Sequence, residues 1–309
     1  MELENEFQEQ HDQIRTLLKE KNGILLAHNY MRDEIQEIAD FQGDSLYLCR
    51  QAAETDAHII VFCGVHFMAE SAAVLCPDKK VLLPNMQAGC PMADMITGDQ
   101  LRKKKEELGG MPIVAYVNTT ADVKAESDIC CTSANVVRVV DSVANEKGVF
   151  MVPDMNLAKF TQTQTETKIE YWKGFCPTHQ LLQGEDVRAM KKTHPEAQFM
   201  AHPECRPEVL ELADHICSTG GMYSYARESD HNEFIVATEM GILYRLRKEN
   251  PGKRFHLASH DLICPNMKVN TLDDVIEVLT EDKNAITVPE EIRIKAKQAL
   301  DRMLAIPRD

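Results

Sequence analysis

Residues 23–30, GILLAHNY, combine an apolar run with a polar ending, and the chain uses this combination twice more. The second occurrence is PIVAYVN at 112–118 and the third is AQFMAHPE at 197–204. His28, Tyr116 and His202 take equivalent places in the three stretches, each directly after an alanine, at a spacing of about 87 residues. A fixed period of this length indicates one supersecondary unit that is used several times.

The repeat continues beyond the apolar runs. Ser45, Ser133 and Thr219 keep the same spacing, and each copy closes with a cysteine, namely Cys90, Cys176 and Cys264. Three copies around a shared centre would bring one thiolate each to a single point.

Each copy alternates short Val/Ile/Leu/Phe runs with helical stretches, which predicts an α/β fold with parallel sheets covered on both faces. We expect domains at 1–88, 89–174 and 175–264. The segment AITVPEEI at 285–292 begins a truncated fourth copy without a cysteine, so residues 265–309 are predicted to complete the first domain.

Composition limits the possible partners. Lys and Arg number 34 against 49 Asp and Glu, a net charge of −15 that repels nucleic acid and anionic lipid. No apolar run is long enough to span a membrane, and the first 21 residues read as a charged amphipathic helix, not a signal peptide. The sequence therefore predicts a soluble, cytoplasmic protein that binds small molecules.

The ten cysteines point to metal or reactive thiols, because the cytosol keeps thiols reduced. No C-x-x-C is present, which argues against a zinc ribbon, a thioredoxin-like dithiol and a ferredoxin cluster. Two centres remain possible for the three repeated cysteines. Zinc would take a histidine as fourth ligand, with His179, His202 or His260 as candidates, whereas an iron–sulfur cubane would leave one iron open to substrate.

The polar residues of the repeat are placed to bind a ligand, because ligands of parallel α/β sheets gather at the carboxyl ends of the strands. The hydroxyls of Ser45, Ser133 and Thr219 precede helical stretches, where they could act as N-caps. Helix N-termini facing one cavity would also bind phosphate or carboxylate.

Short motifs in order along the chain resemble those of the quinolinate synthase family. They are AHNY at 27–30, GDS at 43–45, GCPMADM at 89–95, AYVNT at 115–119, CTSAN at 131–135, GFCPTH at 174–179, AHPEC at 201–205, STGGM at 218–222, ATEMG at 237–241 and CPNMK at 264–268. The resemblance covers about residues 24–270 and implies three homologous three-layer αβα domains in pseudo-threefold arrangement around a central site.

The resemblance also implies an activity. Members condense iminosuccinate with dihydroxyacetone phosphate to quinolinate, releasing phosphate and two waters, in the biosynthesis of NAD. By analogy the chain would be a condensing and dehydrating enzyme of transferase or lyase type, linked functionally to an aspartate-oxidising enzyme. A non-redox [4Fe-4S] cluster on Cys90, Cys176 and Cys264 would present an open iron as Lewis acid.

The motifs imply a catalytic set of Tyr30, Glu204 and His202, with Tyr30 and Glu204 as the acid–base pair. They also imply a substrate-binding set of His28, Ser45, Tyr116, Val117, Asn118, Ser133, His202, Pro203, Glu204 and Thr219.

The chain differs from some members of the family at one motif, and two other functions would also fit three cysteines on three α/β units. Some members carry C-x-x-C-x-x-C at the last cysteine, but this chain reads CPNMKVN at 264–270, which argues against thiol–disulfide regulation there. A diphthamide-biosynthesis enzyme would also place three cysteines on three α/β domains, but it would cleave S-adenosylmethionine. A non-enzymatic iron–sulfur sensor would need a partner surface, and no basic patch or apolar stripe indicates one.

Overall fold

The computed structural model describes residues 7–309, which form three four-stranded sheets in which every strand pair is parallel. In each sheet the order is the second, first, third and fourth strand of its unit. The strands are β1 (Gly23–His28), β2 (Phe41–Gly43), β3 (Ile59–Cys63) and β4 (Lys80–Leu82); β5 (Ile113–Tyr116), β6 (Ile129–Cys131), β7 (Val149–Val152) and β8 (Ile169–Tyr171); and β9 (Gln198–Ala201), β10 (His215–Ile216), β11 (Glu233–Ala237) and β12 (Arg254–Leu257).

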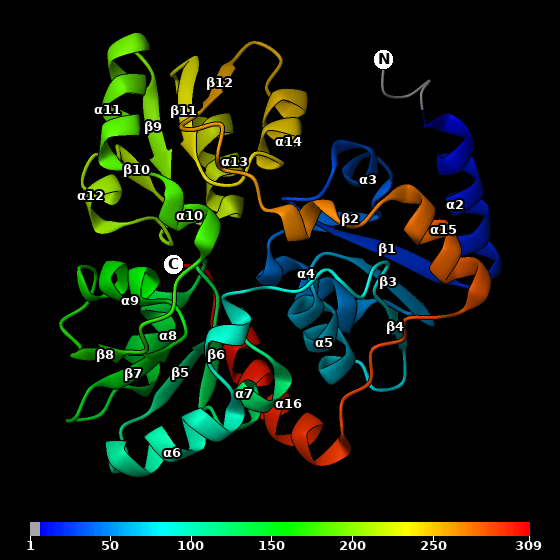
Figure 1. Ribbon diagram of the computed structural model, residues 1–309, viewed down its shortest axis with the longest axis horizontal. Helices are drawn as coiled ribbons and strands as arrows, with labels where there is room; N and C mark the ends of the chain where they lie inside the picture. Colours follow the sequence, from blue (N-terminus) through cyan, green and yellow to red (C-terminus); the bar gives the residue numbers. More distant parts are fainter. Residues whose placement is uncertain (1–6) are drawn as a thin grey trace.

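Helices connect successive strands, and Figure 1 shows the three sheets with their helices around a common centre. The predicted α/β fold with three αβα units is confirmed. The helices are α2 (Gln8–Glu20), α3 (Asp33–Ile38), α4 (Ser45–Glu54), α5 (His66–Leu75), α6 (Gly98–Leu108), α7 (Ala121–Ala125), α8 (Val136–Val143), α9 (Met155–Gln162), α10 (Pro177–Leu181), α11 (Gly184–Thr193), α12 (Pro207–Leu210), α13 (Thr219–Glu228), α14 (Ile242–Glu249), α15 (Leu272–Glu281) and α16 (Glu290–Leu304), with 3₁₀ helices η1 (Ala93–Met95) and η2 (Pro265–Lys268).

Local sequence explains these elements. The central strands β5 (IVAY) and β7 (VFMV) are buried at every residue, as expected for apolar strands in a parallel sheet. Helix α6 begins with a capping box between Thr97 and Gln100 and ends at Gly109, whose φ of +56° is the left-handed conformation that favours glycine. Strand and helix ends are therefore set by neighbouring residues.

The sequence patterns missed one strand in each sheet. β2, β6 and β10 are edge strands of only two or three residues. Such short segments have too few positions to show an apolar periodicity.

The end of the sequence reaches more than one unit. Helix α15 packs against α2, whereas α16 packs against α7 and β6 of the second unit as well as α5 of the first. Ala285 forms a single antiparallel bridge with Leu82, and residues 283–289 contain no strand of a fourth copy. The domain limits 1–88 with 265–309, 89–174 and 175–264 stay a prediction.

The expected N-terminal helix is present as α2, and residues 1–6 of that prediction lie outside the described part of the chain. Within residues 7–309, no helix combines the length and the apolar character that crossing a membrane requires.

Candidate functional site

A cavity of about 140 Å³ lies where the strand ends of the three sheets meet. All three units contribute side chains to its wall, which agrees with the rule that ligands bind at the carboxyl ends of parallel strands. The predicted site residues that line it are His28, Tyr30, Ser45, Cys90, Tyr116, Asn118, Ser133, Cys176, His202, Glu204, Thr219 and Cys264.

Val117 and Pro203 do not line this cavity. Each is the middle residue of a strand-end tripeptide, where the backbone leaves the strand in a bend or a turn. Val117 is buried in the apolar core, and Pro203 lines a separate groove behind the cavity.

The three repeated cysteines share one local structure. Each is followed by a proline, Pro91, Pro177 or Pro265, and then by a short helical turn. Pro177 and Pro265 are the first residues of α10 and η2, a position that suits proline because it has no N–H to leave unpaired. Cys176 and Cys264 take the N-cap positions of α10 and η2, so free backbone N–H groups lie close to the sulfur atoms.

Burial and mutual charge oppose ionisation of these thiols in the metal-free chain. Burial raises the pKa of Cys90 to about 12, and the N–H of Ala93 partly opposes this shift. The pKa values of Cys176 and Cys264 are also raised, first of all by burial, and Cys90 interacts electrostatically with both sulfur atoms.

Three soft sulfur donors that lie in one buried space therefore fit a cationic, thiolate-binding metal centre, which would compensate their charge. All ten cysteines are free, and those outside this trio are buried except Cys217.

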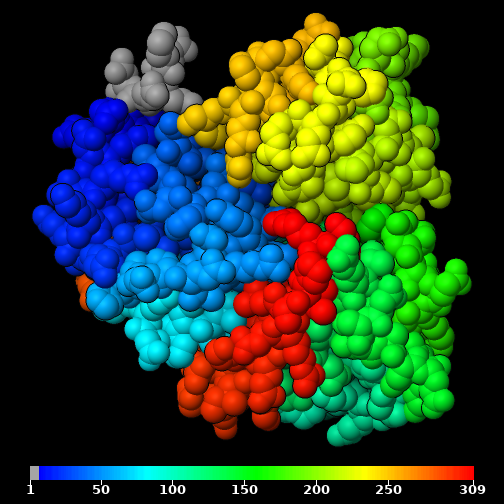
Figure 2. All heavy atoms as spheres, turned by 180° about the vertical axis from the view of Figure 1, so that it is seen from behind, coloured from blue at the N-terminus to red at the C-terminus, as the bar shows by residue number. Residues whose placement is uncertain are grey.

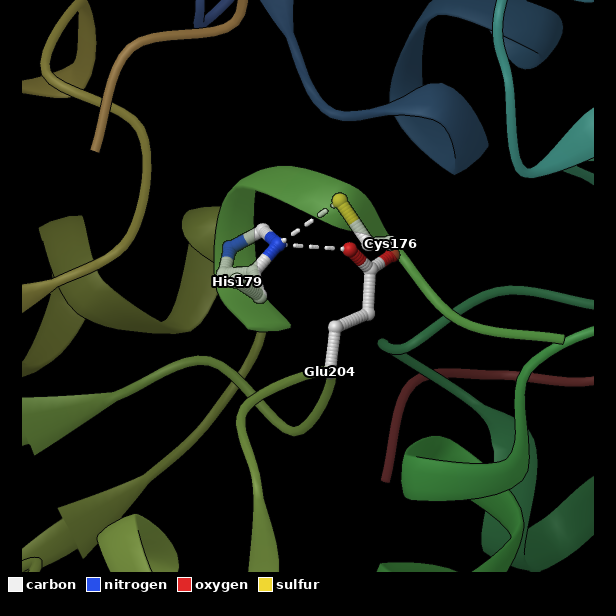
Figure 3. Close-up of side chains that lie close together, drawn as sticks. All are labelled: Cys176, His179 and Glu204. Atoms are coloured by element: carbon white, nitrogen blue, oxygen red, sulfur yellow. Dashed lines mark hydrogen bonds and ion pairs between the residues drawn. The ribbon is translucent and has the colours of Figure 1, made fainter. Parts of the chain in front are cut away.

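Figure 3 shows a contact that the sequence patterns did not predict, between Cys176, His179 and Glu204. The Nδ1 atom of His179 lies 2.8 Å from Glu204 Oε2 and 3.1 Å from Cys176 Sγ. His179 is 1% exposed, and its ring stacks on that of His202 with ring centres 4.9 Å apart. From the sequence, His179 is a candidate only as a zinc ligand, although it stands three residues after Cys176.

On its other side, His179 contacts a buried threonine. His179 Nε2 lies 2.9 Å from Thr238 Oγ1, and Thr238 Oγ1 lies 2.5 Å from the hydroxyl of Tyr30. With Nδ1–H donating to the Glu204 carboxylate and Nε2–H donating to Thr238, the hydroxyl of Thr238 is left to donate to Tyr30. Tyr30, Thr238, His179 and Glu204 thus form a continuous hydrogen-bonded chain.

Glu204 is held on a second side by Tyr116, whose hydroxyl donates to Oε1 at 2.5 Å. Burial alone would raise the pKa of Glu204, but charge and hydrogen bonds from His179, together with the Tyr116 bond, outweigh it and lower the pKa. Glu204 is therefore ionised. Burial and the nearby Glu204 charge raise the pKa of Tyr30 well above its usual value, so Tyr30 keeps its proton.

His202 lines the cavity next to His179 as a neutral ring. Its Nδ1 accepts the N–H of Glu204 at 3.4 Å, and its Nε2 lies 3.2 Å from Ser133 Oγ. Burial lowers the pKa of His202 to about 3 and that of His28 to about 4.

The hydroxyls expected at helix starts are not the N-caps. Asp44 caps α4, Asn135 takes the N-cap position of α8, and Ser218 caps α13. Ser45, Ser133 and Thr219 instead line the cavity, where Thr219 Oγ1 accepts from Asn29 Nδ2 at 2.8 Å.

Comparison with known proteins gives a consistent result. Residues 12–305 match the family model described as quinolinate synthetase A protein. The chain is 59% identical over 296 residues to a quinolinate synthase of Geobacter sp. (strain M21), covering 96% of this chain and 97% of that protein. It is 59% identical to the enzyme of Geotalea uraniireducens and 53% identical to that of Methanosarcina barkeri, with the same coverage of both chains.

Proposed function

Because the chain belongs to the quinolinate synthetase A family, an enzyme family of NAD biosynthesis, we propose that it condenses iminosuccinate with dihydroxyacetone phosphate. The products are quinolinate, one phosphate and two waters. One observation supports this most directly. A single cavity holds the three Cys-Pro turns together with the hydrogen-bonded chain that runs from Tyr30 through Thr238 and His179 to Glu204.

Cys90, Cys176 and Cys264 would hold a [4Fe-4S] cluster, which supplies a Lewis-acidic iron for a substrate oxygen without changing redox state. The donor set supports this assignment over zinc. His179 is already engaged by Glu204 and Thr238, and His202 by Ser133 and the Glu204 backbone, while His260 does not line the cavity.

Ring formation requires proton removal from carbon beside a carbonyl and protonation of departing hydroxyl groups, steps that a positioned acid and base accelerate. Glu204, ionised and buried, is the base at one end of the hydrogen-bonded chain. Tyr30, which keeps its proton, is the acid at the other end. His179 and Thr238 connect them, so that a proton given up by Tyr30 is replaced through Thr238 from His179.

Substrate contacts follow from groups that remain free in the cavity. Asn118 Oδ1 is buried with no hydrogen-bond partner among the described residues, so it can accept from a substrate N–H or O–H. Neutral His28 and His202 donate or accept without adding charge, and the hydroxyls of Ser45, Ser133 and Thr219 suit the carboxylates. Val117 and Pro203 would act only through their backbone.

We place the enzyme in the cytoplasm, since ten free cysteines need a reducing compartment. Its unstable imine substrate would come from an aspartate-oxidising enzyme.

Anaerobic reconstitution with iron and sulfide tests the proposal. About four irons per chain and quinolinate detected by mass spectrometry after addition of both substrates are the expected results. A protein that binds only zinc, or an iron–sulfur protein that forms no quinolinate, would contradict it.

A further inference from the structure

A second, larger space lies directly behind the wall of the cavity. It is a groove of about 780 Å³, and Asp44 and Ser133 line both the groove and the cavity. The two spaces are therefore neighbours that share part of one wall.

At two strand ends, neighbouring residues line different spaces. His28 and Tyr30 line the cavity, whereas Asn29 between them lines the groove. His202 and Glu204 likewise line the cavity, while Pro203 lines the groove. Both tripeptides belong to turns, closed by the N–H of Met31 to His28 O at 3.0 Å and by that of Cys205 to His202 O at 2.9 Å, and in each the middle residue lines the groove while its two neighbours line the cavity.

An ion pair stands at the shared part of the wall. Arg308 Nη1 donates to Asp44 Oδ2 at 2.8 Å and Arg308 Nη2 to Asp44 Oδ1 at 2.9 Å, a bidentate arrangement. The Arg308 side chain is 39% exposed, whereas that of Asp44 is 9% exposed. Gly220 lies against the pair, since a Cβ there would come within 2.6 Å of Asp44 Oδ2 and 2.8 Å of Arg308 Nη1.

The segment that carries Arg308 joins all three units. Asp309 donates its N–H to Ala134 O and accepts with its carboxylate from the N–H groups of Val137 and Arg138 at the start of α8. Figure 2 shows the end of the sequence, in red, reaching the place where the blue, green and yellow parts of the molecule meet. Arg308 is thus fixed at the junction from which the cavity is formed.

Of the arginines that line the groove, Arg308 is the one whose carboxylate partner, Asp44, also lines the cavity. Arg227 pairs with Glu228 and Arg245 with Glu249, and neither carboxylate lines the cavity. A phosphate or dicarboxylate offers the guanidinium of Arg308 the same pair of oxygens as Asp44. Asp44 would keep a partner after the exchange, because its Oδ1 also accepts the N–H of Tyr47 at 3.0 Å.

We propose that this groove is an entry site for a small dianion, a phosphate ester or a dicarboxylate, and that Arg308 binds it by releasing Asp44. The proposal rests on the proposed function for the identity of the anionic substrates. A chain of net charge −15 repels anionic substrates overall, but a cation at the entrance attracts them locally. Arg308 is then a residue that binds and selects the substrate before the chemistry begins.

Steady-state kinetics of the reconstituted enzyme test this. Arg308→Gln should raise KM for dihydroxyacetone phosphate about tenfold and leave kcat within about twofold, with Arg308→Lys in between. The kcat/KM of the unmodified enzyme should fall as salt shortens the Debye length from about 30 to about 8 Å, and this fall should be weaker in Arg308→Gln.

Arg302→Gln is the matched control, because Arg302 is an exposed arginine of α16 that contacts Asp128 O and does not line the groove. Identical KM and salt dependence in Arg308→Gln and Arg302→Gln would overturn the proposal, as would a loss of kcat with KM unchanged.

Calorimetric titration with inorganic phosphate needs no turnover and separates this proposal from the proposed function. Binding should weaken about tenfold in Arg308→Gln and stay unchanged in Arg302→Gln. Phosphate binding that is absent from the unmodified protein, or equal in both variants, would refute the entry site even if quinolinate forms. Failure to form quinolinate with phosphate binding lost only in Arg308→Gln would refute the proposed function alone.

Discussion

A proton that passes between Tyr30 and His179 must pass through the hydroxyl of Thr238. This hydroxyl can be removed with little change in the shape of the side chain. The Thr238 side chain is fully buried, and Oγ1 contacts Tyr30 OH at 2.5 Å and His179 Nε2 at 2.9 Å. Thr238→Val keeps the branched side chain but leaves two buried polar groups without this partner. Tyr30 is 9% exposed and His179 1% exposed, so water does not readily replace it.

Both stability and turnover should respond. Each buried group left unpaired costs about 1–3 kcal/mol, so we expect the free energy of unfolding to fall by about 2–6 kcal/mol. Interruption of general acid–base transfer should lower kcat by about 10²–10⁴-fold. The cysteines are untouched, so iron content should stay the same.

The assay is quinolinate formation per cluster under anaerobic conditions, with urea unfolding of each variant. Thr238→Ser keeps a hydroxyl and should retain kcat within about tenfold. Thr161→Val is the matched control, because Thr161 is equally buried but its Oγ1 only donates to Leu157 O inside α9. If Thr238→Val and Thr238→Ser turned over within about threefold of each other, the proton would not travel through this hydroxyl.

Three further outcomes are expected. Cys176→Ala should lose iron and the absorbance near about 400 nm. Cys49→Ala, a change in the core, should keep both. If Cys176→Ala kept its iron, Cys176 would be excluded as a ligand. Glu204→Gln should keep the cluster but lower kcat about 10²–10⁴-fold, and unchanged turnover would remove Glu204 as the base. Burial lowers the pKa of His28 to about 4 from 6.5, so the unfolded chain takes up a proton first and stability falls as pH drops through this range. His28→Gln should remove about 1.4 kcal/mol per pH unit of that slope in urea titrations of the metal-free protein, and equal slopes in both proteins would contradict the assignment.

The sequence predicted the features that repeat. Strand ends at His28, Tyr116 and His202 and the three cysteines share one phase, and the structure brings all six to one cavity. Repetition works as a signal because equivalent positions of equivalent units face the same centre.

Features that occur once were not predictable in this way. Thr238 lies 208 residues from Tyr30, in a different unit, and 59 from His179 in its own unit, and no spacing rule connects such contacts. Arg308 and Asp44 are 264 residues apart and have no counterpart in the repeat. The strand β10 was missed because two residues are too few to show a periodicity, so that only its pairing with β9 reveals it.

Helix α16 covers β6 and α7, which are made much earlier in synthesis. About 160 residues separate β6 from α16, so a ribosome adding about 5–20 residues per second needs roughly 8–30 s to supply this cover. During that interval α16 does not yet cover the three residues of β6, Ile129, Cys130 and Cys131, which are all buried in the folded protein. A stalled translation product would expose apolar and oxidisable surface at this place, which makes the nascent chain a natural client for chaperones.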